Sequence, residues 1–371
     1  MKKIKVLVVD DSAFMRKMVS DILSSDNDIE VVGNAKDGVE AVELTQKLSP
    51  DVITMDVEMP RMNGLEAVKK IMEIKPTPIL MLSALTKKGA VETLEALEYG
   101  AVDFIQKPSG TISLDIRKIG EELINKVKSA SRAYVRRRVA TPQRRERIGG
   151  IRGTHDVEET HEKPISGVNV EIPTEKLKNS AVIIGSSTGG PPIVSEIISK
   201  LPKNMPPIFV VQHMPKGFTK MFASRLDAGS VLTVKEAQDG ELVKPGHVYV
   251  APGDCQMLLR KRGNDTYIKL DSQMPKVHGT KPSVDVTAEY VSKIYGKNTV
   301  GVILTGIGRD GAYGLSLIKK KGGKIIAQNE ETCVVFGMPK AVIEMNIADA
   351  ILPTSKIPEA IVKFVKDIVG G

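Results

Sequence analysis

Residues 181–192 read AVIIGSSTGGPP, a stretch that combines a strand, a tight turn and the start of a helix. The apolar run 181–184 is typical of a buried strand in a parallel sheet. Glycines allow the backbone conformations of a tight turn, and a proline in the first turn of a helix removes no hydrogen bond that the helix needs. The pattern predicts an α/β fold in which Ser187 is exposed beside the free amides of a helix N-terminus.

Strand and helix patterns alternate on both sides of a central segment, so we expect two α/β domains. The chain of 371 residues is too long for one ordinary core. In residues 1–128, five apolar runs alternate with helical patterns, which predicts a parallel sheet covered on both faces. The expected strands are Lys3–Val9, Ile29–Val32, Asp51–Met55, Pro78–Leu82 and Ala101–Ile105.

Residues 179–371 form the second expected domain, a mostly parallel, doubly wound sheet with an antiparallel hairpin. Its expected parallel strands are Ala181–Ile184, Pro207–Val211, Val300–Thr305 and Lys324–Ala327. Three further runs resemble antiparallel strands, and the last two of them form the hairpin. These runs are His247–Ala251, Gln256–Arg260 and Thr266–Leu270.

The segment 129–178 lacks apolar periodicity and is predicted to be a flexible, arginine-rich linker. Eight arginines lie in residues 129–153 against one acid, while the formal net charge of the whole chain is +8. The positive charge therefore belongs to a segment rather than to a folded nucleic-acid-binding face. His155 and His161 of this segment are expected to be solvated.

Cysteine and apolar content exclude two classes of protein. With only Cys255 and Cys333, a disulfide framework is excluded. No apolar run approaches the roughly 18 residues of a membrane span, and the N-terminus does not resemble a signal peptide. We therefore expect a cytoplasmic monomer without direct membrane insertion.

Polar residues follow the strands of the first domain at their carboxyl ends, where doubly wound sheets bind ligands. Asp10, Asp11 and Asp56 would repel one another unless a hard cation lies among them, and Mg²⁺ prefers such oxygen ligands. Asp56 can then attack a phosphoryl group whose charge the metal and Lys107 neutralise. Ser83 can donate a hydrogen bond to the new phosphate.

These residues, with the motif MPxxNG at 59–64 and the pair Lys107-Pro108, resemble the receiver domain of response regulators, a flavodoxin-like (βα)5 fold. The resemblance implies that Asp56 is the phosphoacceptor and that a histidine kinase is the phosphodonor. The implied metal site consists of Asp10, Asp11, Asp56 and the backbone carbonyl of Glu58. The implied switch consists of Ser83, Phe104 and Lys107.

A serine nucleophile in the second domain requires a base, and the base requires an acid that orients it. The strand that follows the turn and its helix leads into His213, and the strand Val300–Thr305 leads to Asp310. In a parallel sheet both residues reach the edge where Ser187 lies. The order of the chain therefore predicts a catalytic triad of Ser187, His213 and Asp310.

Two alternatives compete for this region. His247 and His278 are also histidines of the second domain, but neither follows a predicted parallel strand. The glycine-rich turn also fits a dinucleotide site, in which the second strand ends in an acid that holds the ribose. Here that strand ends in Gln212 and His213, which argues against a dinucleotide.

Five motifs of the second domain resemble the chemotaxis protein-glutamate methylesterase family, CheB, and the resemblance covers both domains in order. They are GSSTGG at 185–190, QHMP at 212–215, APGD at 251–254, PSVD at 282–285 and VVFGMP at 334–339. The resemblance implies hydrolysis of glutamate methyl esters on methyl-accepting chemoreceptors and deamidation of glutamines. We expect the unphosphorylated receiver to cover the active-site edge, and we expect no cofactor for ester hydrolysis.

Two positions depart from the family pattern. Relatives often read GMGNDG where this chain has Ile307 and Arg309, so substrate fit can differ here. The first turn residue is often alanine but is Ser186 in this chain, which leaves Ser186 as the alternative nucleophile to Ser187. The expected oxyanion donors are the backbone amides of Thr188, Gly189 and Ile307.

The alternative from another functional class is a DNA-binding response regulator with an unrecognised output domain. Such a domain requires a helix-turn-helix with basic residues on its recognition helix. The region after residue 180 instead shows strands and a serine turn, so we expect no nucleic-acid partner.

Overall fold

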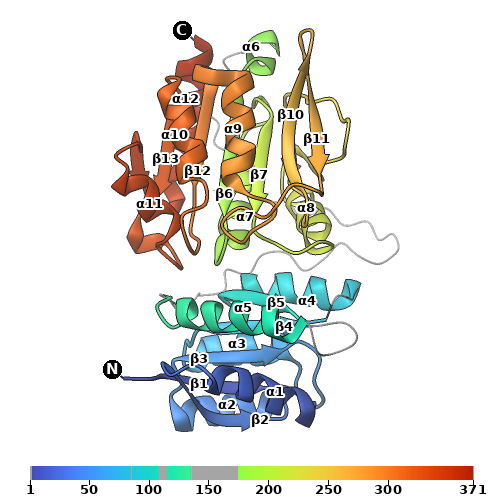
Figure 1. Cartoon of the computed structure of the whole chain (residues 1–371), viewed down its shortest axis with the longest axis vertical. Coiled ribbons are helices and arrows are strands. Elements are labelled where there is room, and N and C mark those ends of the chain that lie inside the picture. The colour runs from blue at the N-terminus through green and yellow to red at the C-terminus, as the bar shows by residue number, and fades with distance from the viewer. Residues whose placement is uncertain (1, 85, 108–114, 134, 136–173, 371) are drawn as a thin grey trace, which may run out of the picture.

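The computed structural model describes residues 2–84, 86–107, 115–133, 135 and 174–370, and it contains two α/β units placed end to end (Figure 1). The predicted linker 129–178 therefore lies largely outside the described residues, as do His155 and His161. Its two ends are helical, because one helix extends to Ala130 and another begins at Thr174. No helix of the described chain is long and apolar enough to cross a bilayer.

The first unit is a five-stranded parallel sheet in the order β2-β1-β3-β4-β5, which confirms the flavodoxin-like prediction. Its strands β3 and β4 are buried at every residue because helices cover both faces. Its elements are β1 (Ile4–Val9), α1 (Ala13–Ser24), β2 (Ile29–Ala35), α2 (Gly38–Leu48), β3 (Val52–Asp56), α3 (Gly64–Ile74), β4 (Ile79–Ser83), α4 (Lys87–Glu98), β5 (Asp103–Gln106) and α5 (Asp115–Ala130).

The second unit contains a seven-stranded, wholly parallel sheet in the order β14-β13-β12-β6-β7-β9-β8, with a separate antiparallel hairpin β10-β11. Its elements are α6 (Thr174–Lys178), β6 (Ala181–Ser186), α7 (Gly190–Lys200), β7 (Ile208–Gln212), α8 (Phe218–Ala228), β8 (Thr233–Glu236), β9 (His247–Val250), β10 (Gln256–Arg262), β11 (Asp265–Asp271), α9 (Val284–Tyr295), β12 (Thr299–Ile303), α10 (Ala312–Lys320), β13 (Lys324–Gln328), α11 (Met338–Glu344), β14 (Ala350–Leu352) and α12 (Ile357–Gly370).

One prediction about this sheet was wrong. The run 247–251 was expected to be antiparallel, but β9 pairs in parallel with both β7 and β8. Apolar patterning identifies a strand but says nothing about its direction, which the connections decide. The short strands β8 and β14 were not predicted, and both lie at the edges of the sheet, where apolar patterning is weakest.

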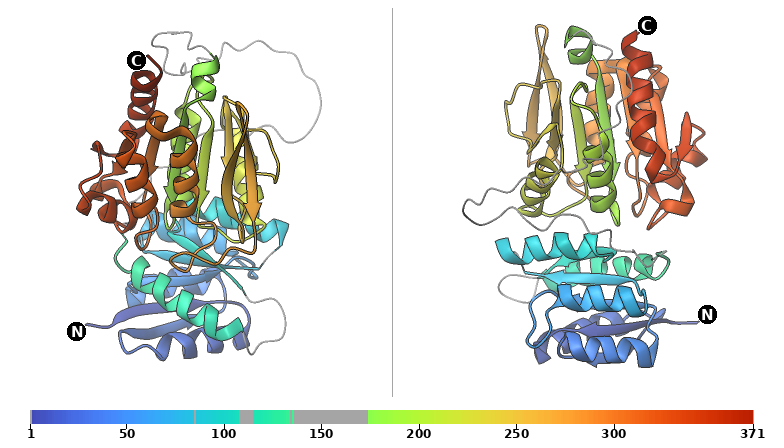
Figure 2. Two further views of the ribbon diagram at one scale, coloured as in Figure 1. Left: turned by 45° about the horizontal axis from the view of Figure 1, so that its top comes forward. Right: turned by 180° about the vertical axis from the view of Figure 1, so that it is seen from behind.

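The strand β6 lies at the switch point of this sheet, between β12 on one side and β7 on the other. Helices α7, α8 and α12 pack on one face, and α9, α10 and α11 pack on the other (Figure 2). Because all strands are parallel, the loops after β6, β7 and β12 share one edge, and this edge faces the first unit (Figure 1). Ligand sites in such sheets lie at this position.

Candidate active site

Ser187 lies on the tight turn between β6 and α7. Gly189 in this turn has φ of 74°, a conformation that favours glycine, and Gly306 opposite has no room for a side chain because a Cβ there would lie 2.7 Å from that of Ser187. The alternative nucleophile, Ser186, is fully buried and its hydroxyl donates to Oε1 of Gln212 at 2.6 Å. Ser187 is half-buried, so it is the serine of this turn that a substrate can reach.

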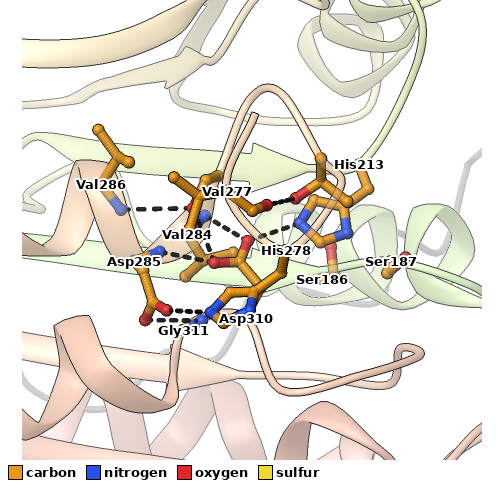
Figure 3. A network of polar contacts seen from close by, with 12 residues as sticks. Ser186, Ser187, His213, Val277, His278, Val284, Asp285, Val286, Asp310 and Gly311 are labelled. Atoms are coloured by element: carbon orange, nitrogen blue, oxygen red, sulfur yellow. Dashed lines mark hydrogen bonds and ion pairs between the residues drawn. The ribbon is translucent and has the colours of Figure 1, made fainter. Parts of the chain in front are cut away.

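The strands that lead to His213 and Asp310, β7 and β12, lie on either side of β6, and His213 lies between Asp310 and Ser187 (Figure 3). Nε2 of His213 lies 2.8 Å from Oδ2 of Asp310, and the second ring nitrogen lies on the side of Ser187 (Figure 3). Within the described residues no hydrogen bond joins the Ser187 hydroxyl to His213. The three predicted residues are therefore brought to one edge, with the acid and the base already paired.

The Asp310 carboxylate is buried and receives hydrogen bonds from the N-terminus of α9 as well as from His213. Oδ1 accepts from the Ser283 hydroxyl at 2.7 Å and from the Asp285 amide at 3.0 Å, and Oδ2 accepts from the Val284 amide at 2.7 Å. Burial by itself would raise the pKa of Asp310, but the His213 interaction and these donors outweigh it and lower that pKa. Asp310 is thus a fixed anion.

The expected oxyanion donors differ in their present partners. The Gly189 amide donates to the backbone oxygen of Val102, a residue of the first unit, at 3.0 Å. The amides of Thr188 and Ile307 have no acceptor among the described residues. Two of the three expected donors therefore have no protein acceptor in the described chain, and the third is occupied by the first unit.

The other two histidines have different surroundings. Nδ1 of His247 lies 3.0 Å from the backbone oxygen of Pro245, away from the edge that carries Ser187. Nε2 of His278 lies 3.1 Å from Oδ2 of Asp285, beside Asp310 (Figure 3). The sequence did not indicate that His278 lies so close to the predicted triad.

His278, Asp285 and Asp310 hold their ligand atoms within 4.8 Å of one another, a spacing that a metal ion could use. However, each carboxylate already accepts hydrogen bonds from backbone amides. Metal binding would displace these donors, so the donor set fits a hydrogen-bonded network rather than a metal centre.

In the first unit, Asp10, Asp11 and Asp56 hold carboxylate oxygens within 4.8 Å of one another. Nζ of Lys107 lies 2.7 Å from Oδ2 of Asp10 and 2.8 Å from Oδ2 of Asp56. Burial raises the pKa of Asp56 to about 6, although Lys107 acts in the opposite direction. A set of carboxylates with only one bridging cation fits an additional Mg²⁺.

The expected switch residues lie between this site and the second unit. Ser83 is buried and accepts a hydrogen bond from the Thr93 hydroxyl at 2.8 Å. Phe104 on the neighbouring β5 is buried against Phe218 of α8, with ring centroids 4.5 Å apart. Phe104 therefore connects the part of the receiver next to the Asp56 site with helix α8 of the second unit.

Further contacts between the units surround the serine turn. The Thr188 hydroxyl donates to Oδ2 of Asp103, and Arg225 of α8 forms a bidentate ion pair with Glu98 of α4. A cavity of about 250 Å³ remains between the units beside these contacts. The first unit thus contacts the serine turn itself, but its packing against the second unit is incomplete.

Sequence reasoning missed several residues of this site. Ser283 and Asp285 hold Asp310 and its loop, and Gln212 donates to the backbone oxygens of Ser187 and His213. All three belong to motifs that were recognised without a role. Asp103 and Val102 contact the serine turn from the other unit. No signal in the sequence could reveal these last contacts, because they arise from docking between distant parts of the chain.

Known proteins resemble both units. The CheB methylesterase family model matches residues 182–361, and the response regulator receiver domain model matches residues 6–117. The protein-glutamate methylesterase/protein-glutamine glutaminase of Methanococcus maripaludis is 61% identical over 100% of both chains, and that of Thermotoga maritima is 49% identical over 98% of both.

Two crystal structures from Thermotoga maritima also match. The CheB methylesterase catalytic domain is 53% identical, with a TM-score of 0.49, and the match covers 50% of this chain and 98% of that one. The response regulator domain of CheB is 57% identical, with a TM-score of 0.33, and the match covers 35% of this chain and 97% of that one.

Proposed function

The chain belongs to the CheB methylesterase family, and on this premise we propose that Ser187 is its nucleophile, His213 its general base and Asp310 the acid that orients the base. The activity is hydrolysis of glutamate methyl esters, with deamidation of glutamines as the same acyl chemistry. The observation that carries the residue assignment is the 2.8 Å contact of His213 with the buried Asp310, beside the half-buried Ser187. The alternative of a DNA-binding output domain is set aside, because the second unit matches the methylesterase family.

The paired geometry assigns a task to each ring nitrogen of His213. Nε2 is held by Asp310, so Nδ1 takes the proton when the Ser187 hydroxyl attacks the ester carbonyl. The same nitrogen then protonates the departing methanol, or ammonia in deamidation. His213 next takes a proton from a water molecule, which attacks the acyl-enzyme and frees the glutamate. Asp310 stabilises the imidazolium in both steps.

Backbone amides complete the proposed site. Thr188 and Ile307 offer amides without a protein acceptor in the described chain, and Gly189 offers a third once Val102 withdraws. Each donor aimed at the oxyanion contributes roughly 10²–10³ in rate in comparable hydrolases. The side chain of Ile307 does not affect this role, because the donor is its backbone.

Asp56 is the proposed phosphoacceptor of the receiver. Asp10, Asp11 and Asp56, with the backbone carbonyl of Glu58, would hold Mg²⁺, which neutralises phosphoryl charge when bound. Lys107 already bridges two of these carboxylates and is placed to bind a phosphoryl oxygen. A new phosphate adds about −1.5 to −2 charges and can accept from the Ser83 hydroxyl.

The enzyme is activated by phosphorylation, and the contacts between the units suggest how it is restrained beforehand. Val102 occupies the Gly189 amide, and Asp103 binds the hydroxyl of Thr188, so the receiver occupies part of the proposed oxyanion site. Movement of Phe104 towards the phosphate would weaken its contact with Phe218. Interfaces between domains of one chain are usually small, so a few kcal/mol are enough to shift this balance.

The remaining assignments concern the organisation of the chain. We propose a receiver at 1–128, a flexible linker at 129–178 and the catalytic domain at 179–371, in a cytoplasmic monomer. The proposed phosphodonor is the chemotaxis histidine kinase, and the proposed substrates are methyl-accepting chemoreceptors. Free cysteines at 255 and 333 agree with a reducing compartment.

The test is methanol release from methylated chemoreceptor, with and without a small-molecule phosphodonor. Wild type should release methanol faster with the phosphodonor, and Ser187→Ala should lose roughly 10⁴-fold or more of the rate under both conditions. Ser186→Ala is the matched control and should remain active, because its hydroxyl is buried on Gln212. Full activity in Ser187→Ala would refute the assignment.

A further inference from the structure

Next to His213, two carboxylates form crossed hydrogen bonds, an arrangement called the carboxylate exchange below: each one binds the N-terminus of the helix that the other precedes or belongs to. Asp310 precedes α10, yet its carboxylate accepts hydrogen bonds at the N-terminus of α9. Asp285 belongs to the first turn of α9, yet its Oδ1 accepts from the amides of Gly311 at 2.9 Å and Gly314 at 2.7 Å, at the N-terminus of α10 (Figure 3). Each carboxylate thus binds the amides and the positive dipole end of the other helix.

This exchange determines where Asp310 lies. The Asp310 backbone is continuous with Gly311, whose amide is held by Asp285, and its side chain is held by the first turn of α9. Both fixed points depend on the same short segment of α9, residues 283–285. If Asp285 released the N-terminus of α10, the loop that carries Asp310 would lose one of its two attachments, and the hydrogen bond to His213 would lose its alignment.

His278 holds the remaining oxygen of Asp285. Its Nε2 lies 3.1 Å from Oδ2 of Asp285, and it is presented by a turn in which Val277 and Thr280 form two backbone hydrogen bonds. The His278 side chain is 43% exposed, whereas that of Asp285 is 6% exposed. The buried carboxylate therefore has amide donors on one oxygen and an imidazole at the rim on the other.

We propose that Asp285 is a positioning residue for ester hydrolysis, which holds Asp310 in line with His213 through this exchange, and that His278 in turn holds Asp285. The inference rests on the proposed roles of Ser187, His213 and Asp310. It gives a function to the PSVD motif at 282–285, because Ser283 and Asp285 are the two side chains of that motif that bind the Asp310 loop.

Electrostatics explain why Asp285 needs all of these partners. The titratable groups that face it are His278 from the preceding loop and Asp310 from the loop before α10, with His213 beyond Asp310. Burial, followed by the charge of Asp310, raises the pKa of Asp285, while the Gly314 amide and His278 lower it. The hydrogen-bond donors around both carboxylates offset part of the cost of burying them side by side.

The experiment compares Asp285→Asn, Asp285→Ala and the control Glu289→Gln, which removes a half-buried charge from the same helix. Methanol release is measured at saturating phosphodonor, and the folded fraction is measured by circular dichroism. We expect Asp285→Ala to lower kcat roughly 10-fold to 100-fold at unchanged KM, the effect of one lost charge-assisted hydrogen bond. Asp285→Asn keeps an acceptor for the α10 amides and should be intermediate, and Glu289→Gln should match wild type.

A second pair of variants tests His278. Residue 278 has φ of 50°, so His278→Gln and His278→Leu share the same backbone strain. Only glutamine retains a donor for Asp285, so kcat should fall more in His278→Leu than in His278→Gln. The downfield proton resonance of the His213–Asp310 hydrogen bond should shift in Asp285→Ala and not in Glu289→Gln, which a purely structural role would not produce.

The outcomes separate this inference from the proposed function. If Asp310→Asn lowers kcat while folded Asp285→Ala has the kcat and the His213 resonance of wild type, the positioning role is wrong and the triad stands. If Asp310→Asn keeps the wild-type kcat, the triad itself is wrong. A rise in KM alone in Asp285→Ala would also overturn the positioning role, since it would place Asp285 in substrate binding.

Discussion

The two α/β units carry carboxylates at the same edge of similar parallel sheets, but their surroundings differ. In the receiver, Asp10 and Asp56 share one lysine, and burial raises the pKa of Asp56 to about 6. In the catalytic unit, Asp310 accepts four hydrogen bonds, two from the first turn of α9, one from its N-cap Ser283 and one from His213, and its pKa is lowered. The same edge of a parallel sheet therefore holds, in one unit, carboxylates that share a single lysine and, in the other, a carboxylate whose two oxygens both accept hydrogen bonds.

This difference corresponds to the two tasks. A site that must accept a metal ion and a phosphoryl group gains from being under-neutralised, because binding then relieves repulsion. A site that must orient an imidazole gains from carboxylate oxygens with no freedom to rotate. The phosphorylation site thus has carboxylates with few donors, and the carboxylate that orients the catalytic histidine has donors on both oxygens.

The largest expected effect comes from removing the charge of Asp310, the carboxylate whose oxygens are all hydrogen-bonded. Asp310→Asn should lower kcat by roughly 10⁴-fold, because an amide cannot accept from every donor around it and favours the wrong tautomer of His213. Methanol release measures the loss. Because the pKa of Asp310 is lowered, protonation of Asp310 should not limit the wild-type rate at mildly acidic pH. A pH at which Asp310→Asn regained the wild-type rate would contradict this role.

The next largest effect comes from removing the charge of Asp56 in the receiver. The raised pKa of Asp56 means that its charged form disfavours folding by about 3 kcal/mol above pH 6, and that this penalty disappears below about pH 4. Asp56→Asn should therefore stabilise the full chain without Mg²⁺ at pH 7, and the gain should vanish near pH 4. Thermal unfolding across this pH range measures it.

The matched control for that measurement is Asp21→Asn, whose carboxylate is exposed and pairs with Lys17. It should change stability little at any pH. Stabilisation by Asp56→Asn that was equal at pH 4 and pH 7 would show that burial of charge is not its cause. Asp56→Asn should also abolish activation by the phosphodonor, because the phosphoacceptor is gone.

The smallest expected effect comes from removing an ion pair between the two units. Arg225→Ala removes the partly exposed ion pair with Glu98 and should raise the unphosphorylated rate up to about fivefold, the equivalent of about 1 kcal/mol. Lys200→Ala, which removes an ion pair within α7, should have no such effect. An unphosphorylated rate that did not change in Arg225→Ala would show that this ion pair does not restrain the enzyme.

Individual residues show which parts of the fold and of the site could be predicted from the sequence. The strand that precedes Ser187 and the strands that precede His213 and Asp310 were each visible as apolar runs, and a parallel sheet places their ends on one edge. The direction of β9 was not visible, because its alternation is the same in either direction. The role of Asp285 was not visible, because the chain separates it by more than 20 residues from Gly311 and Gly314, from whose amides it accepts hydrogen bonds. His278 is only seven residues from Asp285, but the turn that brings the two side chains together is defined by the folded loop.

Local order along the chain thus determined the two folds, the family and the residues proposed for phosphorylation and catalysis, since strand ends and glycine turns are short-range features. The tertiary structure alone decided which serine of the turn is accessible, how α9 and α10 exchange carboxylates, and that the receiver occupies the Gly189 amide. These features depend on burial and on hydrogen bonds between distant segments. Such bonds form only when the packed sheets bring those segments together.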